Sequence, residues 1–554
     1  MAAENTVEAP ITVLDLFSGC GGLSEGFHQF RPKGGSTPVF RSIGAVEWEP
    51  AAAASYTMNF GAESNRTRYF DPPDIFCGDI VEWEPKWRPG DVDVVVGGPP
   101  CQGFSGLNRH KVRADRNKLW QEFIRVVIAL QPKLFVIENV DRFVRSAEFN
   151  DLQDRIGSGD LANYQLVEPP GANENDTEWE RARRYLLNAA DYGASQARRR
   201  SIVIGVRTDA GLPVETMRYP EPTHSRTTQL KRKRVDGALT SLSPWETVED
   251  LFSRTAGMKL ETTELPGGRA TTVKGIASSI AGPFLTTELH FARRPEPISL
   301  ARYKAIPTNG NRKNLRGRYL CRFHSGAELI LEKGGAPRDP QGSLDVLGTY
   351  KVVVDGGATL KSLAVRSVEI ESVSLRRSKS AVYRVEVWDG RASHDATLEY
   401  LSTQAWDEHD TGTGDVMGRM RSGAPAVTIR TEFFKPEKGR YLHPTENRPI
   451  THFEAAKLQG FPDDFRWCGS KTEIAKQIGN AVPVPLGKKI AESIYDYLRL
   501  VDPGDSDRRE LSEVVALLRA RPSDARAFEG FDTHHVNVED LAFQSLDMVA
   551  SAPS

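Results

Sequence analysis

A cysteine on a proline-stiffened turn is the first side chain of this sequence that could do chemistry. Cys101 stands in Gly97-Gly-Pro-Pro-Cys-Gln-Gly-Phe-Ser105, directly after the apolar run of residues 92–96. The active sites of parallel sheets form at the carboxyl ends of the strands, and backbone dipoles near such a turn can support a thiolate. Most cysteines are instead small buried hydrophobes, and that alternative stays open. The position makes Cys101 a candidate nucleophile.

Charged side chains stand at the ends of two other predicted strands. Glu138-Asn-Val follows the apolar residues 134–137, and Gln196-Ala-Arg-Arg-Arg200 precedes the apolar residues 201–204. Neighbouring strands would place the carboxyl of Glu138 beside the thiol of Cys101. Each feature has a structural explanation by itself, but three of them at strand ends indicate one active site.

A glycine-rich turn near the start of the chain could hold a cofactor. Asp15-Leu-Phe-Ser-Gly-Cys-Gly-Gly22 joins a predicted strand to a helix, where glycines let the backbone approach a ligand and the helix offers free N–H groups. Glu47 ends the next predicted strand, where a carboxylate can accept hydrogen bonds from ribose hydroxyls. The turn lacks the G-x-G-x-x-G spacing of dinucleotide sites. We therefore expect an adenosine-containing cofactor other than NAD.

The elements that must position these groups alternate between strand and helix over about the first 200 residues. We expect strands at residues 11–14, 44–46, 92–96 and 134–137, and helices at 23–30, 50–58 and 119–130. This alternation predicts an α/β fold with a parallel, doubly wound sheet. From about Tyr219 the composition turns to Thr, Ser, Arg and Gly with short alternating strands, and helices return at residues 451–458 and 485–500.

Composition narrows the class of protein. The 554 residues include 39% hydrophobic and 26% charged side chains and carry a formal net charge of −2, as is typical of globular proteins. No run approaches the roughly 18 apolar residues of a membrane span, and the acidic start does not have the pattern of a signal peptide. The five cysteines lie far apart, which argues against a disulfide framework or a zinc site. We expect a cytoplasmic protein with no membrane partner and no metal.

Six motifs in a fixed order give the sequence a family resemblance. In this order they resemble the DNA (cytosine-5) methyltransferase family, of the prokaryotic modification type. The match covers residue 11 to about 206 and about 415 to 494. The motifs are Asp15-Leu-Phe-Ser-Gly-Cys-Gly-Gly22, Pro99-Pro-Cys-Gln-Gly-Phe-Ser105, Glu138-Asn-Val140, Gln196-Ala-Arg-Arg-Arg200, Leu458-Gln-Gly-Phe-Pro462 and Gln477-Ile-Gly-Asn480.

The resemblance implies a Rossmann-like, S-adenosylmethionine-dependent methyltransferase domain and a smaller, irregular, β-containing target-recognition domain. Residues 11–218 would form the first part of the catalytic and cofactor-binding domain, and residues 441–500 its return. The target-recognition region would span residues 219–440, with a β-rich insertion at about 322–398. Residues 501–554 would be a C-terminal tail.

The resemblance also implies a mechanism for the methylation of cytosine in DNA. The thiolate of Cys101 would add to carbon 6, so that carbon 5 becomes a nucleophile, and Glu138 would hold or protonate ring N3. Arg198, with Arg200 in support, would fix the carbonyl of the base and the carboxylate; phosphate contact or structural pairing is the alternative for both arginines. Carbon 5 would then take the methyl group of S-adenosylmethionine, and elimination of Cys101 would release 5-methylcytosine.

The same resemblance implies a pocket for S-adenosylmethionine, assembled from six parts of the sequence. The first turn would line the methionine and adenosine side, Glu47 would take the ribose hydroxyls, and Trp48 would stack on adenine. The remaining residues would address the adenine edge and the sulfonium region or close the pocket from the C-terminal segment. The predicted cofactor-binding residues are Phe17, Gly19, Gly21, Glu47, Trp48, Asp79, Ile80, Pro99, Leu119, Asn480 and Val482.

Duplex DNA hides carbon 6, so the implied chemistry requires the cytosine to be flipped into the pocket. Residues 102–118 contain Arg109, Lys111 and Arg113, as a basic loop that closes over DNA would. A solvated surface loop is the alternative. The implied partners are double-stranded DNA and a cognate restriction endonuclease acting on the same site, and we expect the protein to be a monomer.

Two other functions remain open at this point. A cytosine-5 methyltransferase that acts on tRNA would share the chemistry and the pocket, although the long recognition region favours duplex DNA. A catalytically silent DNA-binding scaffold would retain the fold, but the presence of Cys101, Glu138 and Arg198 argues against it.

Overall fold

The structure is a computed structural model of the whole chain. It describes residues 9–501, except for residues 63, 65, 67, 101–111, 212–213, 227–230, 234–238, 261, 336–343, 355–356, 372–381 and 409–414.

An eight-stranded sheet forms the first layer of the fold. Its order is β3-β2-β1-β4-β5-β8-β6, and β7 also pairs with β8. The apolar segments of β4 and β5 are fully buried, as the central strands of a parallel sheet require. The strands are β1 (Ile11–Leu16), β2 (Phe40–Glu47), β3 (Asp74–Cys77), β4 (Val94–Gly97), β5 (Leu134–Asn139), β6 (Tyr164–Leu166), β7 (Leu186–Asn188) and β8 (Arg199–Arg207).

The pairing confirms the doubly wound α/β prediction but corrects one part of it. The five strands from β3 to β5 are parallel, whereas β8 runs antiparallel to β5, β6 and β7. Only residues 189–198 separate β7 from β8, and so short a connection returns the chain antiparallel instead of crossing over the sheet. The sheet is therefore mixed at this edge.

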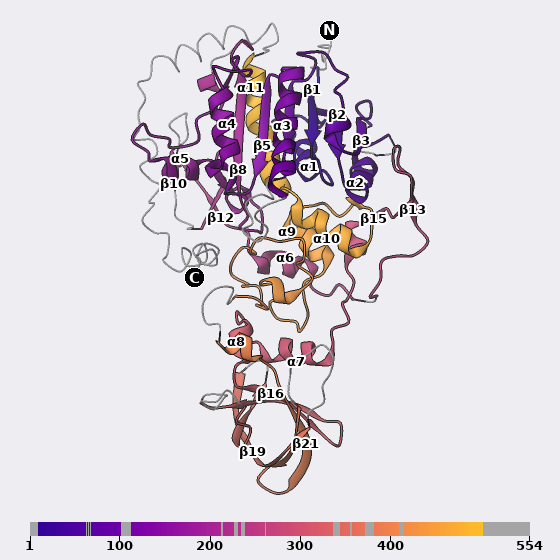
Figure 1. Cartoon of the computed structure of the whole chain (residues 1–554), viewed down its shortest axis with the longest axis vertical. Coiled ribbons are helices and arrows are strands. Elements are labelled where there is room, and N and C mark those ends of the chain that lie inside the picture. Colours follow the sequence, from indigo (N-terminus) through magenta and orange to yellow (C-terminus); the bar gives the residue numbers. More distant parts are fainter. Residues whose placement is uncertain are drawn as a thin grey trace.

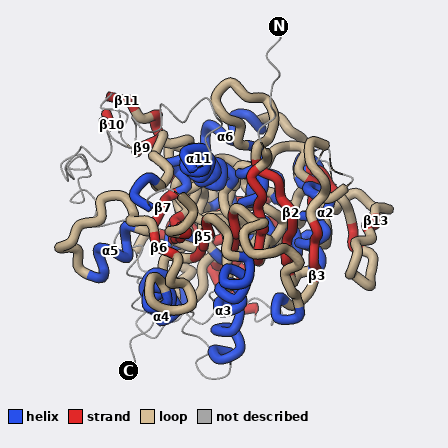
Figure 2. The backbone as a smooth tube through the Cα atoms, turned by 90° about the horizontal axis from the view of Figure 1, so that it is seen from above, coloured by secondary structure: helices blue, strands red, loops and turns tan. Residues whose placement is uncertain are grey.

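Helices cover both faces of the sheet. Figure 2 shows α11 on one face and α3 and α4 on the other. Helix α1 packs closely against α11, so the first and last helices of the described chain are neighbours. The helices of this part are α1 (Gly22–Gln29), α2 (Pro50–Phe60), α3 (Val112–Leu130), α4 (Ala147–Arg155), α5 (Glu178–Arg184) and α11 (Val484–Val501).

The chain between the sheet and α11 forms a second, irregular part with its own buried core. Short strands pair two at a time instead of forming one sheet. Its helices are α6 (Val248–Thr255), α7 (Pro297–Ala305), α8 (Gln404–Glu408), α9 (His452–Leu458) and α10 (Lys471–Asn480). Its strands are β9 (His224–Ser225), β10 (Lys231–Lys233), β11 (Leu239–Ser241), β12 (Ser243–Pro244), β13 (Ala270–Thr271), β14 (Ile280–Ala281), β15 (Phe284–Leu285) and β22 (Arg466–Trp467).

Three of these helices begin at capping boxes that can be read in the sequence. Thr247, Thr451 and Ser470 each accept a hydrogen bond from the backbone N–H three residues on, and the acidic side chain there bonds back to the cap. Each box satisfies two N–H groups that a helix leaves unpaired. The starts of α6, α9 and α10 are therefore determined locally.

A closed barrel of six antiparallel strands lies at the end of the molecule away from the large sheet (Figure 1). Strand β16 pairs with both β17 and β21, which closes the ring. Tyrosines 319, 350 and 400 fill its own core. The barrel spans residues 318–400, around the range expected for an insertion: β16 (Arg318–Phe323), β17 (Glu328–Lys333), β18 (Gly348–Val354), β19 (Gly357–Glu371), β20 (Val382–Trp388) and β21 (Ser393–Tyr400).

Short 3-10 helices complete the described structure, at Ile80–Glu82 (η2), Phe143–Arg145 (η4), Ala189–Tyr192 (η5), Val214–Thr216 (η6), Thr286–Leu289 (η7), Arg312–Leu315 (η8) and Pro436–Lys438 (η9). Among the described residues, no helix is both long and apolar enough to cross a bilayer. The same residues contain no group of His, Cys, Asp and Glu side chains arranged for a metal ion.

Candidate active site

An open cavity of about 2540 Å³ lies at the carboxyl ends of the strands, between the large sheet and the irregular part. The ends of β1, β2, β4 and β5 form one wall, and residues 415–441 contribute to the opposite side. Ten of the eleven predicted cofactor residues line it, together with Glu138, Arg198 and Arg200. The tertiary structure therefore brings groups from both ends of the chain into one site.

The glycine-rich turn after β1 has an unusual backbone. Phe17 and Gly19 both have φ of 56° and Gly21 has φ of 91°, a region that non-glycine residues rarely adopt. An added Cβ at Gly19 would meet no atom within 4 Å, so the turn is open on the side of the cavity. Gly21 does not line the cavity; its Cβ would lie 2.5 Å from the ring of Phe60, so its role is to let the turn pack.

Glu47 closes this turn from β2. Its Oε2 accepts a hydrogen bond of 2.7 Å from the N–H of Gly19, and its Oε1 accepts one of 2.8 Å from the N–H of Glu49. Burial raises the pKa of Glu47, although the two backbone donors favour the charged form. A carboxylate oxygen can accept more than one hydrogen bond, so the group can still take hydroxyl donors. The neighbouring Trp48 is 64% exposed, which leaves a large ring free at the cavity.

The other predicted cofactor residues lie around the same opening. The side chain of Asp79 accepts a hydrogen bond of 3.1 Å from the N–H of Val81 and so caps the 3-10 helix that begins at Ile80. Pro99 and Leu119 line the cavity below β4, and Asn480 and Val482 reach it from the end of α10. Residues some 400 positions apart in the chain thus face one space.

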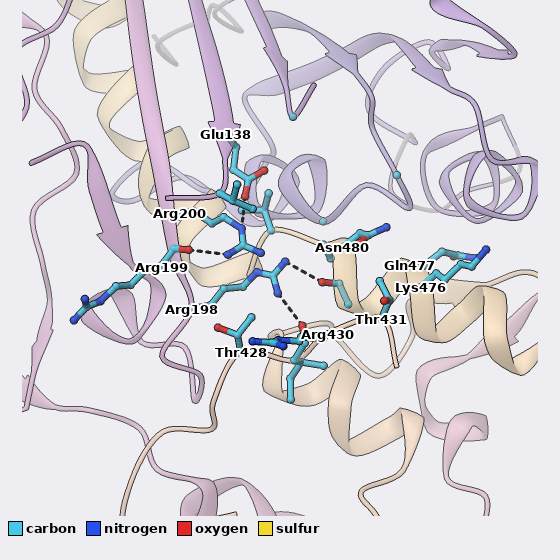
Figure 3. A pocket seen from close by; sticks show the side chains of 18 of the residues that line it. Glu138, Arg198, Arg199, Arg200, Thr428, Arg430, Thr431, Lys476, Gln477 and Asn480 are labelled. Carbon is cyan, nitrogen blue, oxygen red and sulfur yellow. Dashed lines mark hydrogen bonds and ion pairs between the residues drawn. The ribbon is translucent and has the colours of Figure 1, made fainter. Parts of the chain in front are cut away.

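Glu138 and Arg200, which both line the cavity, form an ion pair (Figure 3). Nε of Arg200 lies 2.9 Å from Oε1 of Glu138. This buried oxygen meets the guanidinium as an ion pair and accepts no hydrogen bond from the described residues. It therefore keeps the capacity to accept a hydrogen bond from a bound group.

Arg198 has different surroundings from those that the sequence suggested. Its guanidinium is fully buried and donates hydrogen bonds of 2.8 Å to the carbonyl of Ile429 and 2.9 Å to the carbonyl of Gly479. Burial, and then the charge of Arg200, lower its pKa. We expected Arg198, with Arg200 in support, to contact the carboxylate, and for this contact the expectation is wrong. Arg200 contacts Glu138. Arg198 instead connects the start of β8 to α10 and to residues 428–431 through its hydrogen bonds.

Two residues that the sequence analysis did not single out also shape the site. The side-chain amide of Asn139 donates a hydrogen bond of 2.8 Å to the carbonyl of Pro99, and so ties the end of β5 to the turn that leads to Cys101. Ser18 lines the cavity with a buried hydroxyl that has no hydrogen-bond partner among the described residues. Asn139 directly follows Glu138, and Ser18 directly follows Phe17. This adjacency to predicted site residues was the sequence signal that could have identified them.

The segment of residues 424–431 joins the irregular part to the cavity. Ala426 pairs with Gln196, through hydrogen bonds of 2.9 Å to the carbonyl of Ser195 and 2.8 Å from the N–H of Ala197. The N–H of Ile429 donates to Oε1 of Gln196 at 2.8 Å. Gln196 is fully buried, so its role is to hold this segment against β8.

Some predicted residues cannot be placed. Cys101, Arg109 and Lys111 lie outside the described residues. Arg113 belongs to α3, and its side chain is not described. These four assignments stay predictions.

The residues present fit S-adenosylmethionine. The cofactor needs acceptors for ribose hydroxyls, a flat apolar surface for adenine and polar groups for the amino-acid end. The cavity provides the buried carboxylate of Glu47, the exposed ring of Trp48 and the unpartnered hydroxyl of Ser18.

The chain is similar to known DNA methyltransferases. The chain is 27% identical over 535 residues to DNA (cytosine-5)-methyltransferase PliMCI of Paracentrotus lividus, covering 90% of this chain and 29% of that protein. It is 28% identical over 514 residues to the Type II methyltransferase M.AgeI of Thalassovita gelatinovora, covering 87% of this chain and 98% of that protein. A solved structure from an E. coli prophage, of a proposed DNA modification methyltransferase, covers 88% of this chain and 99% of its own, with 20% identity and a TM-score of 0.42.

The chain spans 28–30% of the length of the four animal relatives that it matches. The family described as C-5 cytosine-specific DNA methylase matches residues 11–267 and 358–496, which together are well over half of the chain. The chain belongs to this family of C-5 cytosine-specific DNA methylases.

Proposed function

We propose that this protein transfers a methyl group from S-adenosylmethionine to carbon 5 of a cytosine that is flipped out of duplex DNA. The observation that carries the proposal is the position of the Glu138–Arg200 ion pair in the same cavity as the Phe17–Gly19 turn and Glu47. One cavity thus offers a polar site for a base next to a site for an adenosine cofactor. Membership of the cytosine-specific family supports the choice of base.

In this proposal S-adenosylmethionine supplies an electrophilic methyl group on a sulfonium. The Phe17–Gly19 turn and Ser18 bind its amino-acid end, Glu47 accepts the ribose hydroxyls and Trp48 covers the adenine. Asp79 and Ile80 face the adenine edge, and Asn480 with Val482 closes the pocket from the C-terminal side. Pro99 and Leu119 keep water from the sulfonium.

The residues around the base act on the cytosine ring. The thiolate of Cys101 forms a bond to carbon 6, and the electron pair of the carbon 5–carbon 6 double bond moves into the ring. Glu138 holds a proton at N3 to stabilise this charge, while Arg200 faces the base carbonyl and keeps the Glu138 carboxyl in place. Asn139 fixes the carbonyl of Pro99 and so positions the turn that bears the nucleophile.

The last steps complete the transfer and return the protein's own groups to their starting state. Carbon 5 would take the methyl group that bound S-adenosylmethionine supplies, and the sulfur would keep the electron pair of the broken bond. A base removes the proton from carbon 5, the ring double bond re-forms, and the thiolate of Cys101 leaves. The products are 5-methylcytosine and S-adenosylhomocysteine.

The biological setting is part of the proposal. The similarity to M.AgeI extends over 98% of that Type II methyltransferase, which supports a modification enzyme in the cytoplasm of a prokaryotic cell. Such an enzyme acts on DNA as a monomer. It protects the sites that a cognate restriction endonuclease would cut. Arg109, Lys111 and Arg113 then contact the DNA around the flipped base.

The test is methylation of DNA in cells that lack cytosine methylation of their own. After expression of the chain, bisulfite sequencing of the genomic DNA should give fully protected cytosines within one sequence motif. The Cys101→Ala variant should give none, while calorimetry shows that it still binds S-adenosylhomocysteine. Sequencing of tRNA from the same cells tests the RNA alternative.

Two results would contradict the proposal. A folded, cofactor-binding protein that leaves DNA unmethylated and methylates tRNA would assign the chain to the RNA substrate. Methylation of DNA by the Cys101→Ala variant would show that the reaction does not need a covalent bond to Cys101.

A further inference from the structure

Three arginines from three separate elements come together beside the cavity. Arg145 ends η4, Arg183 lies in the last turn of α5, and Arg199 begins β8. None of them belongs to the base or cofactor sites described above. Arg199 also lines the rim of the cavity.

The fold brings these residues together through β7. Helix α5 directly precedes β7 and packs against η4, and Asn188 of β7 is paired with Arg199 of β8. Side chains alternate along a strand, so Arg199 points away from Arg198 and Arg200, as Figure 3 shows. Arg199 and Arg145 lie close enough to Arg183 of α5 for their charges to act on it.

One acidic neighbour acts on this group, because burial raises the pKa of Asp191 and the charge of Arg199 lowers it. Among the described residues, no carboxylate forms an ion pair with Arg145, Arg183 or Arg199, whereas Arg184 is paired with Asp176. Glu180 is engaged in the capping box of α5, and the nearby Asp191 accepts a hydrogen bond of 2.8 Å from the indole of Trp245. Burial lowers the pKa of Arg183, and the charges of Arg199 and Arg145 lower it further.

Trp179 completes the group. Its ring is 51% exposed, and the guanidinium carbon of Arg183 lies 4.4 Å from the ring centroid. Stacking fixes the plane of a guanidinium and leaves its N–H edge free for a planar or tetrahedral anion. A cation at the end of α5 complements the helix dipole, but this does not account for the convergence of Arg145 and Arg199 on the same place.

We propose that Arg145, Arg183, Arg199 and Trp179 form a phosphate-binding patch that holds the DNA backbone where the duplex leaves the cavity. The inference rests on the proposed function, because it takes duplex DNA as the ligand. Unpaired cations that repel one another are stabilised when phosphates lie between them, and guanidinium–phosphate contacts are strong and frequently bidentate. The patch fixes the position of the duplex and reads no base.

Salt dependence of DNA binding measures such contacts directly. We would measure the affinity of the full-length protein for a 30-base-pair duplex of mixed sequence at several salt concentrations by fluorescence anisotropy. Each phosphate contact contributes about 0.9 to the slope of log K against log salt. The single variants Arg145→Gln, Arg183→Gln and Arg199→Gln should each lower the slope by about this amount. The triple variant should lower it by the sum of the three.

Arg88→Gln is the matched control. Arg88 is an exposed arginine in the loop before β4, at the edge of the sheet opposite to the cavity, and its replacement should leave the slope unchanged. Unchanged slopes in the three patch variants, or an equal loss in Arg88→Gln, would overturn the proposal. Calorimetry with S-adenosylhomocysteine shows that each variant is folded.

Failure of the patch and failure of the proposed function give different results. If the native protein methylates DNA and the triple variant keeps the native slope, only the patch is wrong. If the native protein neither binds nor methylates duplex DNA, the proposed function fails, and the patch falls with it.

Discussion

Two arginines of one motif, two positions apart, have opposite surroundings. Arg198 is fully buried and bonds only to carbonyl groups, whereas Arg200 is partly exposed to the cavity and faces a carboxylate. A buried guanidinium that satisfies backbone carbonyls supports the fold. A cation that meets a carboxylate in a cavity is available to a substrate. The same side chain therefore has a structural role at one position and a proposed chemical role at the other.

The same substitution at both positions should separate these roles. Arg198→Met leaves the carbonyls of Ile429 and Gly479 without donors, so the free energy of unfolding should fall by about 3 kcal/mol. Arg200→Met should change stability by less than about 1 kcal/mol but lower the rate of methyl transfer by about 100-fold. Urea unfolding and methyl incorporation into genomic DNA measure the two effects. Equal destabilisation by both variants would contradict this division.

Asp15 makes stability depend on pH. Burial raises its pKa to about 7, against the opposing effect of the hydrogen bond of 2.6 Å from Ser24. The folded state thus keeps a proton that the unfolded chain releases near pH 4. The free energy of unfolding therefore decreases as the pH rises from about 4 to about 7, because the folded state keeps the proton of Asp15. Above about pH 7 this contribution no longer changes.

Asp15→Asn should remove this dependence, because the amide stays neutral and can still accept from Ser24. Compared with the native protein, the variant should gain stability between pH 5 and pH 8, by about 1.4 kcal/mol for each pH unit at most. Urea unfolding of the variant and of the native protein at pH 5 and at pH 8 measures this difference in the free energy of unfolding. A constant difference between variant and native protein at both values would rule out Asp15 as the source.

At the scale of elements, the contact between α1 and α11 joins the two ends of the catalytic part. The helices approach so closely that a Cβ on Gly26 would lie 2.6 Å from backbone atoms of Gly487 and Lys488. A Cβ on Gly487, in contrast, would first meet the flexible side chain and the carbonyl of Leu23 at 3.3 Å. Only the contact at Gly26 cannot be relieved by a small movement of a side chain, because it is with backbone atoms.

Gly26→Ala should therefore destabilise the protein by about 2 kcal/mol, although alanine favours a helix, because the backbone of α11 must move away. Gly487→Ala is the control and should be nearly neutral, since the gain in helix propensity offsets a mild contact. Urea unfolding of both variants measures the effects. A stabilised Gly26→Ala variant would show that the two helices can separate at no cost.

At the scale of the whole molecule, the barrel is attached through its first and last strands. It also packs through Leu320, Ile330 and Val353 against α7, in one apolar cluster. The N–H of Leu401 donates a hydrogen bond of 2.9 Å to the carbonyl of Arg318, so the chain leaves and re-enters the irregular part at one place. The barrel has its own core, and none of its strands lines the cavity. The barrel is thus structurally separate from the site.

Replacement of residues 319–400 by a short Gly–Ser linker should leave a folded protein. Its affinity for S-adenosylhomocysteine, measured by calorimetry, should equal that of the native chain, because the cofactor residues lie in other elements. A matched deletion of residues 348–400 leaves β16 and β17 with exposed edges and should aggregate. Loss of cofactor binding in the complete deletion would show that the barrel supports the site.

The sequence by itself determined the local features. Alternating apolar runs predict β1, β2, β4, β5 and β8 and the helices α1, α2, α3, α9 and α11, but they do not predict β6, β7, α4, α5 or α10. The glycine-rich turn and the Glu-Asn-Val motif indicate where ligands would bind. These features depend on residues close together in the chain, so periodicity and turn chemistry reveal them.

The tertiary structure decided what depends on distant neighbours. It turned β8 antiparallel, closed six short strands into a barrel, buried Arg198 and gave the carboxylate contact to Arg200. It also joined Arg145, Arg183 and Arg199 from three elements. The physical reason is that burial and pairing between side chains depend on packing, and no local pattern distinguishes an arginine that bonds a buried carbonyl from one that faces a cavity.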